Sequence, residues 1–121
     1  DKGALDYKED NDYPDFIIPV AEAVSKDSNS KGIVLGGSGQ GEAFVANKVK
    51  GVRAARYYGR DKKIITLSRE HNDANILSLG ARFLSDEEAK DAVKIWLETE
   101  FSGDERHSRR IEKIKNYENN S

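Results

Sequence analysis

The sequence has no cysteine, no methionine and only two histidines, and each shortage excludes a class of protein. Without cysteine, the chain can build neither a disulfide framework nor a thiolate zinc site. The two histidines, His71 and His107, are too few for a histidine-rich metal centre. We therefore expect a protein that holds no metal and needs no cofactor.

Long apolar runs and a leader peptide are absent as well. No run approaches the roughly 20 apolar residues that a membrane helix needs. The chain opens with Asp1, Lys2 and Gly3 instead of a secretory signal. We expect a cytoplasmic protein without membrane contact. Because the first residue is not methionine, we also expect the 121 residues to form a single domain that has lost its beginning.

The charge is nearly balanced overall but uneven along the chain. Charged residues make up 35% of the sequence and the net charge is −2, which argues against general nucleic-acid binding. Residues 106–115 hold five lysines or arginines and one histidine beside a single acid. Such a local patch suits a small anion better than a polyanion, although a solvated basic helix face is an equal alternative.

Apolar residues cluster in short segments that alternate between strand and helix patterns. Strands are predicted at 32–35, 52–57 and 76–79, and helices at 14–26, 42–48, 61–70, from Ser85 onward and at 104–117. Strands that alternate with helices predict a three-layer α/β/α, Rossmann-like fold whose parallel sheet is covered on both faces. Residues 1–14 are interpreted as a loop.

Helix starts carry the clearest local signals. Pro14 is well suited to the first turn of a helix, although Pro19 is a defect further along it. Ser85 and Glu88 form a capping-box pattern. The inward faces of the last two helices are predicted to comprise Ala89, Ala92, Val93, Trp96 and Leu97, and Ile111 and Ile114.

A glycine-rich segment joins the first predicted strand to the next helix. Residues 36–42 read Gly-Gly-Ser-Gly-Gln-Gly-Glu. Glycines let the backbone turn its N–H groups inward, so this segment predicts a concave anion site. It is not a Walker A loop and matches a dinucleotide fingerprint only loosely. A tight turn without a ligand is the alternative.

Glu42 follows this loop directly. A carboxylate at the start of a helix is electrostatically favourable, so Glu42 can be a plain helix-start acid. It can equally be a general base beside an oxyanion pocket. The pattern alone leaves both interpretations open.

Several ordered motifs resemble the ribose-5-phosphate isomerase B family, which also includes allose- and galactose-6-phosphate isomerases. They are residues 32–43 (GIVLGGSGQGEA), 46–55 (ANKVKGVRAA), 69–75 (REHNDAN), 79–82 (LGAR) and 106–111 (RHSRRI). The resemblance extends from about Tyr13 to Ile114 and implies a five-stranded parallel sheet, of which three strands are recognisable. It also implies aldose–ketose isomerisation of ribose 5-phosphate and ribulose 5-phosphate through an enediolate.

The resemblance assigns roles to particular residues. Many family members have a cysteine base where this sequence has Gly36, and a subgroup uses a glutamate at the position of Glu42 instead. By this likeness Glu42 is the base, His71 the acid that opens the sugar ring and Ser38 an assisting hydroxyl. The implied substrate-binding residues are Gly37, Ser38, Gly39, Gln40, Gly41, Asn72, Arg82, Arg106, Arg110 and Tyr13, with the three arginines on the phosphate. His107 is expected to face elsewhere, either touching the phosphate or serving a structural role.

The spacing of Arg106 and Arg110 supports part of this assignment independently, because residues four apart share one face of a helix. Two other interpretations compete here. His71 can be a helix C-cap, and Arg82 can pair with Asp86.

The resemblance further implies a homodimer whose active sites lie between subunits, with the C-terminal arginines supplied by the neighbour. Family members begin with a strand, a helix and a strand, and the first strand ends in an Asp-His pair that contacts substrate. No such segment precedes Tyr13. The alternative function is therefore a non-catalytic sugar-phosphate-binding or assembly subunit. A nucleotide binder is disfavoured, because no acid follows the second strand to hold a ribose.

Overall fold

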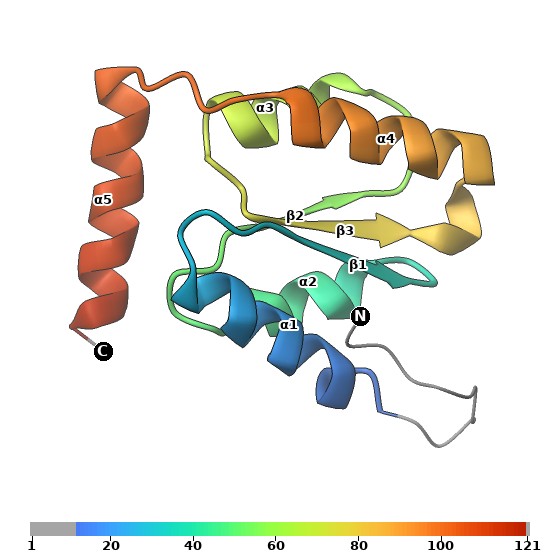
Figure 1. Cartoon of the computed structure of the whole chain (residues 1–121), viewed down its shortest axis with the longest axis horizontal. Coiled ribbons are helices and arrows are strands. Elements are labelled where there is room, and N and C mark those ends of the chain that lie inside the picture. The colour runs from blue at the N-terminus through green and yellow to red at the C-terminus, as the bar shows by residue number, and fades with distance from the viewer. Residues whose placement is uncertain (1–11, 121) are drawn as a thin grey trace.

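The computed structural model describes residues 12–120, which form an α/β fold (Figure 1). The strands in this range are β1 (Gly32–Gly36), β2 (Ala54–Tyr57) and β3 (Ile76–Gly80). The helices are α1 (Pro14–Lys26), α2 (Gln40–Ala46), α3 (Lys63–Glu70), α4 (Asp86–Glu98) and α5 (Glu105–Asn119), and a short 3₁₀ turn, η1, spans Ala81–Phe83. Most of the segment predicted to be a loop at the N-terminus lies outside the described range.

The three strands are parallel and β3 lies in the centre, in the order β1-β3-β2. Helices α1 and α2 lie on one side of the sheet and α3 and α4 on the other, while α5 stands beside these layers (Figure 1). The predicted three-layer fold is confirmed. Because all strands run the same way, the loops after β1 and β3 meet at the carboxyl ends of the strands. The segments before them meet at the amino ends of the strands.

Two clusters of buried apolar side chains fill the space between the layers. The cluster beneath α1 and α2 contains Ile17, Ala21, Val24, Val34, Ala46, Val52 and Ile76. The cluster beneath α3 and α4 contains Tyr57, Ile65, Ala74, Leu77, Leu79, Ala92 and Trp96. Trp96 is fully buried, as expected for a core residue.

The sheet is not covered on both faces along its whole width, which corrects the prediction. Ile33 and Leu35 of β1 are 38% and 61% exposed. They pair in register with Leu77 and Leu79 and therefore share the face that packs against α3 and α4. Those helices contact β2 and β3, so among residues 12–120 nothing covers this face of the edge strand β1.

The local start signals are confirmed. Helix α1 begins at Pro14 and continues through Pro19. The side chain of Ser85 accepts a hydrogen bond from the N–H of Glu88 at 3.1 Å, and the carboxylate of Glu88 accepts one from the N–H of Ser85 at 2.9 Å. Within the described range, no helix is both long and apolar enough to cross a membrane.

Two predicted inward positions are wrong. Leu97 is 48% exposed, because α4 faces the sheet through Ala92 and Trp96 and the next residue is turned by about 100°. Ile114 is 53% exposed. Helix α5 buries only His107 and Ile111, so its contact with the layers is narrow and Ile114 lines a pocket instead.

Candidate active site

The glycine loop turns sharply between β1 and α2. Gly39 has a φ of 75°, a left-handed conformation that glycine adopts without strain. A Cβ at this position would also lie 3.0 Å from the carbonyl carbon of Leu79. The chain can therefore pass this close to the end of β3 only with glycine at position 39.

The loop leaves hydrogen-bond donors unused. The N–H of Gln40 donates to the hydroxyl of Ser38 at 3.2 Å. The N–H groups of Ser38 and Gly39 take part in no hydrogen bond within residues 12–120. These groups can therefore serve an anion, as the glycine pattern predicts.

The carboxylate of Glu42 lies directly beside this loop. Glu42 belongs to the first turn of α2 and is only 9% exposed. A Cβ placed on Gly36 would collide with the carboxylate. Position 36 must therefore be glycine for the carboxylate to lie where it does. A cysteine at position 36 and this placement of Glu42 exclude each other sterically.

Tyr13 and Arg82 approach the same loop from two other elements. The hydroxyl of Tyr13, which precedes α1, lies over Gly41, where an added Cβ would collide with it. An Nη atom of Arg82 would lie 3.0 Å from a Cβ on Gly37. In the part of the chain that the structure describes, Arg82 forms no ion pair with Asp86. We call residues 36–42 with Tyr13 and Arg82 the loop cluster.

A second group of predicted site residues lies around a pocket of about 440 Å³. His71, Asn72 and Arg110 line this pocket together with His107. The rings of His71 and His107 are stacked, with centroids 4.1 Å apart and an interplanar angle of 16°. We call these four residues and their pocket the histidine pocket. His71 does occupy the C-cap position of α3 while it lines the pocket.

His107 is the most buried member of the histidine pocket, at 5% exposure. Its Nε2 atom has no hydrogen-bond partner within residues 12–120. Burial lowers the pKa of His107 below 6.5, and the nearby charges of His71 and Arg106 lower it further. His107 therefore favours the neutral state, and its ring packs against His71 instead of facing away from the site.

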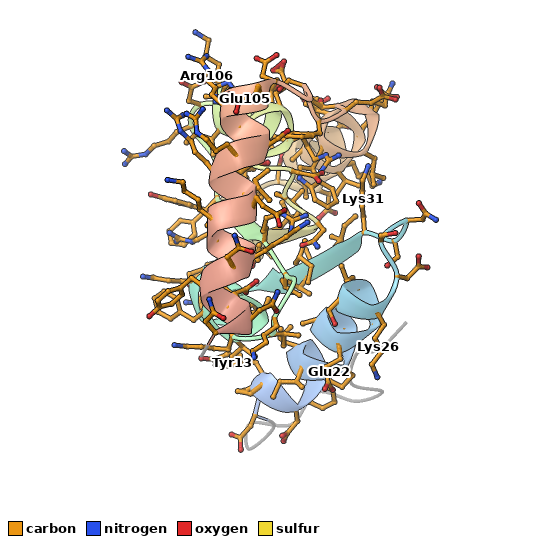
Figure 2. All side chains as sticks on the ribbon, turned by 90° about the vertical axis from the view of Figure 1, so that its left-hand side faces the viewer. Tyr13, Glu22, Lys26, Lys31, Glu105 and Arg106 are labelled. Atoms are coloured by element: carbon orange, nitrogen blue, oxygen red, sulfur yellow. The ribbon has the colours of Figure 1, made fainter. Side chains whose placement is uncertain are left out.

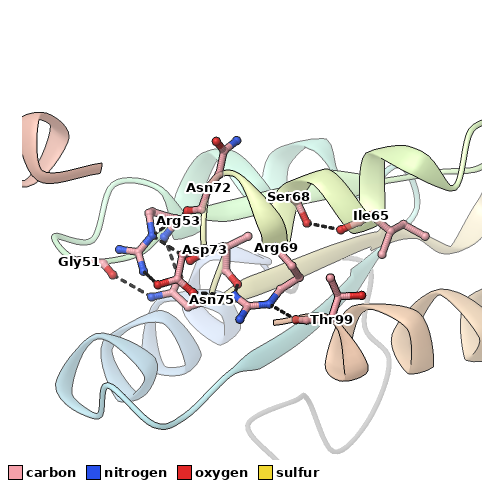
Figure 3. A network of polar contacts seen from close by, with 10 residues as sticks. Gly51, Arg53, Ile65, Ser68, Arg69, Asn72, Asp73, Asn75 and Thr99 are labelled. Atoms are coloured by element: carbon pink, nitrogen blue, oxygen red, sulfur yellow. Dashed lines mark hydrogen bonds and ion pairs between the residues drawn. The ribbon is translucent and has the colours of Figure 1, made fainter. Parts of the chain in front are cut away.

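Two arginines hold the segment that carries His71 and Asn72 (Figure 3). Arg69, which is 5% exposed, donates to a carboxylate oxygen of Asp73 at 2.9 Å and to the carbonyl of Ala74 at 2.6 Å. Arg53 donates through Nε to the carbonyl of Asp73 at 2.9 Å. Arg69 within the motif and Arg53 outside it thus hold the turn at 69–75, because charged donors that have several partners resist displacement.

The loop cluster lies at the carboxyl ends of the strands, and the histidine pocket lies at their amino ends. His71 and Asn72 precede β3, whereas Arg82 and the glycine loop follow β3 and β1. The five residues Ile76–Gly80 span about 13 Å, at about 3.3 Å per residue. Figure 2, which looks onto α5, shows Arg106 at the top of this helix and Tyr13 near its lower end. One chain therefore does not bring its predicted site residues together.

Only one of the two predicted phosphate-binding arginines of α5 lies at the histidine pocket. Arg110 lines the histidine pocket, whereas Arg106 is exposed at the start of α5 and is not part of the pocket wall. Among residues 12–120, no three side chains of His, Cys, Asp or Glu come together as metal ligands would.

Sequence reasoning missed two residues that touch the glycine loop. Arg56 donates through Nε to the carbonyl of Ser38 at 2.8 Å, and Ser78 donates through Oγ to the carbonyl of Gly39 at 2.7 Å. A signal existed in each case, because a charged or polar residue interrupts an otherwise apolar strand. The contacts themselves depend on strand pairing, which the sequence does not display.

Comparison with known proteins gives a consistent result. The model of the family described as Ribose/Galactose Isomerase matches residues 1–114. Ribose-5-phosphate isomerase B of Mycobacterium tuberculosis is 43% identical over 118 residues, which cover 98% of this chain and 72% of that protein.

Solved structures agree with this result. The ribose-5-phosphate isomerase B of Mycoplasma genitalium, with bound ribulose-5-phosphate, has a TM-score of 0.91 and 42% identity, covering 98% of this chain and 77% of that one. The type B enzyme of Trypanosoma cruzi has a TM-score of 0.87 and 45% identity, with 93% and 74% covered.

Proposed function

This chain belongs to the ribose/galactose isomerase family, and we propose that it interconverts ribose 5-phosphate and ribulose 5-phosphate. The observation that carries the proposal is the loop cluster, where a buried carboxylate lies beside unused backbone donors. Its relatives from M. tuberculosis and M. genitalium are named for this activity, and the latter holds ribulose-5-phosphate. Because such substrates are charged and stay where they are formed, the proposal places the enzyme in the cytoplasm.

Glu42 acts as the base. The reaction moves a proton from the carbon next to the carbonyl to the carbonyl carbon, while the hydroxyl proton passes from one enediolate oxygen to the other. One carboxylate can accept the carbon-bound proton and return it. The electrons remain in the sugar, and no redox cofactor enters the balance. Gly36 keeps the space beside the loop open for this carboxylate. The main support for the role of Glu42 is its burial against the loop.

The glycine loop stabilises the enediolate. As the proton leaves, negative charge develops on the former carbonyl oxygen. The free N–H groups of Ser38 and Gly39 can donate to that oxygen without reorganising, which is the usual origin of a large electrostatic contribution. The hydroxyl of Ser38 assists from the same loop. Arg82, whose guanidinium lies over Gly37, binds the phosphate.

The complete site requires two chains. The loop cluster holds the base, and the histidine pocket holds His71, the acid of ring opening. These two groups lie at opposite ends of the strands of one sheet. A symmetric dimer contains two equivalent contacts. In each of them, one patch of a subunit meets a second, different patch of its partner. We propose that the pocket of one chain, with His71 and Asn72, faces the loop cluster of the other. Arg106 and Arg110 then reach the partner's substrate phosphate.

Substitution of Glu42 by Gln tests the assignment of the base. The amide keeps the shape of the side chain but cannot accept the proton, so kcat for ribose 5-phosphate should fall at least about a hundredfold. The affinity for ribose 5-phosphate, measured by calorimetry, should change little. Unchanged turnover would refute the role of Glu42. If the unsubstituted protein binds the sugar phosphate but does not isomerise it, the protein is instead a sugar-phosphate-binding subunit of the same fold.

A further inference from the structure

Three successive carbonyl groups of the glycine loop are held by donors outside the loop. The carbonyl of Gly37 accepts from the backbone N–H of Arg82 at 2.9 Å. The carbonyl of Ser38 accepts from Nε of Arg56 at 2.8 Å, and that of Gly39 accepts from Oγ of Ser78 at 2.7 Å. Each peptide of the turn is thus fixed from the protein side.

Fixing a carbonyl also fixes the next N–H group. In a trans peptide the C=O and N–H bonds of one unit point in opposite directions, and the chain has no cis peptide in its described range. When Arg56 holds the carbonyl of Ser38, the N–H of Gly39 must point away from Arg56. By the same reasoning, the bond from Arg82 to Gly37 turns the N–H of Ser38 outward. Neither of these two N–H groups has a partner within residues 12–120.

Arg56 and Ser78 lie beside each other on two neighbouring strands. They are register partners in the parallel pair β2–β3, so their side chains leave the same face of the sheet at the same level. Ser78 is fully buried. Beside them, a Cβ on Gly80 would lie 2.6 Å from the carbonyl oxygen of Ser38, so glycine at position 80 allows this carbonyl to approach.

The guanidinium of Arg56 is itself held in place. Its central carbon lies 3.8 Å from the ring centroid of Tyr58, which is a close cation–π contact. The ring of Tyr58 meets that of Phe83 edge-on, with centroids 5.8 Å apart. Arg56 pairs with no carboxylate in the part of the chain that the structure describes, so no anion neutralises the charge that it places on the carbonyl of Ser38. A cation on a carbonyl polarises the whole peptide and strengthens its N–H as a donor.

We propose that Arg56 is a positioning residue for the isomerase reaction, which aims and polarises the N–H of Gly39 toward the substrate's developing oxyanion, while Ser78 holds the following peptide of the turn. This inference rests on the proposed function, because that function supplies the oxyanion. Arg56 does not touch substrate in this account. Its effect is therefore confined to the step in which charge develops and leaves the binding of the phosphate unchanged.

The test compares Arg56→Met, Arg56→Lys and the matched control Arg60→Met, which removes the same charge from an exposed residue four positions along the chain. Removal of an oxyanion donor costs about a hundredfold or more, and here the donor remains but is no longer held, so Arg56→Met should lower kcat about tenfold. KM for ribose 5-phosphate should stay within about twofold. Arg56→Lys should recover part of the loss, because lysine still donates to a carbonyl.

A second measurement does not depend on turnover. The backbone amide chemical shifts of Gly39, measured by NMR, should change in Arg56→Met, because the carbonyl of the same peptide loses its charged donor, and should stay at their original values in Arg60→Met. Equal kcat in Arg56→Met and the unsubstituted protein overturns the inference, and so does an equal loss in Arg60→Met or a loss expressed only in KM. If the unsubstituted protein shows no isomerase activity, the proposed function fails. The amide chemical shifts of Gly39 then decide the positioning role alone, and shifts that are unchanged in Arg56→Met refute it.

Discussion

Substitution of Gly36 by Ala adds a single methyl group and should disable the enzyme without unfolding it. The added Cβ would occupy the space of the Glu42 carboxylate, which must retreat by about 1 Å or more to reach ordinary van der Waals separation. The Glu42 side chain is largely buried, so a retreat of this size also changes the contacts that hold the carboxylate. Alanine itself fits a strand at least as well as glycine does, so β1 should persist.

The size of the effect follows from the displacement. A misplacement of about 1 Å between a base and its proton can cost about a hundredfold in rate, and we expect a fall of this size in kcat. KM for ribose 5-phosphate should change by less than about threefold, because Glu42 moves a proton and does not hold the phosphate. Steady-state kinetics by absorbance of the ketose product, with circular dichroism as a control for folding, measures both quantities.

Gly37→Ala is the matched control one residue away. Its Cβ would meet only the end of the flexible Arg82 side chain, at 3.0 Å, so it should raise KM and leave kcat nearly unchanged. A kcat for Gly36→Ala within about threefold of the original value would show that Glu42 is not the base, because a base that tolerates this displacement is not the group that moves the proton. Equal effects of the two substitutions on kcat would also contradict it.

Two further predictions concern the histidine pocket and its support. Burial keeps the pKa of His107 below 6.5, so on acidification the unfolded chain binds a proton at this residue before the folded protein does. The contribution of His107 to the free energy of unfolding should therefore be constant above about pH 6.5 and decrease as the pH falls below it. His107→Phe retains a ring that can stack on His71 and should remove this slope in urea unfolding between about pH 7.5 and 5; an identical slope in both proteins would contradict the prediction. Arg69→Leu should lower the free energy of unfolding by about 3 kcal/mol, because the carbonyls of Ala74 and Thr99 lose a buried charged donor. A loss below about 1 kcal/mol in the same urea assay would show that the turn at 69–75 does not depend on Arg69.

Local signals predicted much of the fold. The start of α1 at Pro14 and the capping box at Ser85 were recognisable because they depend on neighbours in sequence. The glycine loop was equally recognisable, since four glycines in six residues imply unusual backbone geometry. The exposure of Ile33 and Leu35 was not, because a wholly apolar strand has the same sequence whether or not a helix covers it.

The division of the candidate site into two halves could have been derived from order along the chain. His71 precedes the third predicted strand and Arg82 follows it, so a parallel sheet places them at opposite edges. The stacking of His71 on His107 could not have been derived, because the course of α5 depends on the turn between Thr99 and Asp104 and not on any repeat in the sequence. The contact of Arg56 with Ser38 likewise arises only when three strands are in register.

A mixture of two inactive variants tests whether Glu42 of one chain works with His71 of another. Glu42→Gln and His71→Ala should each retain little activity alone. In a heterodimer, the intact loop cluster of the His71→Ala chain meets the intact pocket of the Glu42→Gln chain, which gives one working site out of two. Random pairing of equal amounts by joint refolding should therefore restore about a quarter of the original activity. Recovery near this value supports the shared site, and a mixture no more active than its two components would contradict it.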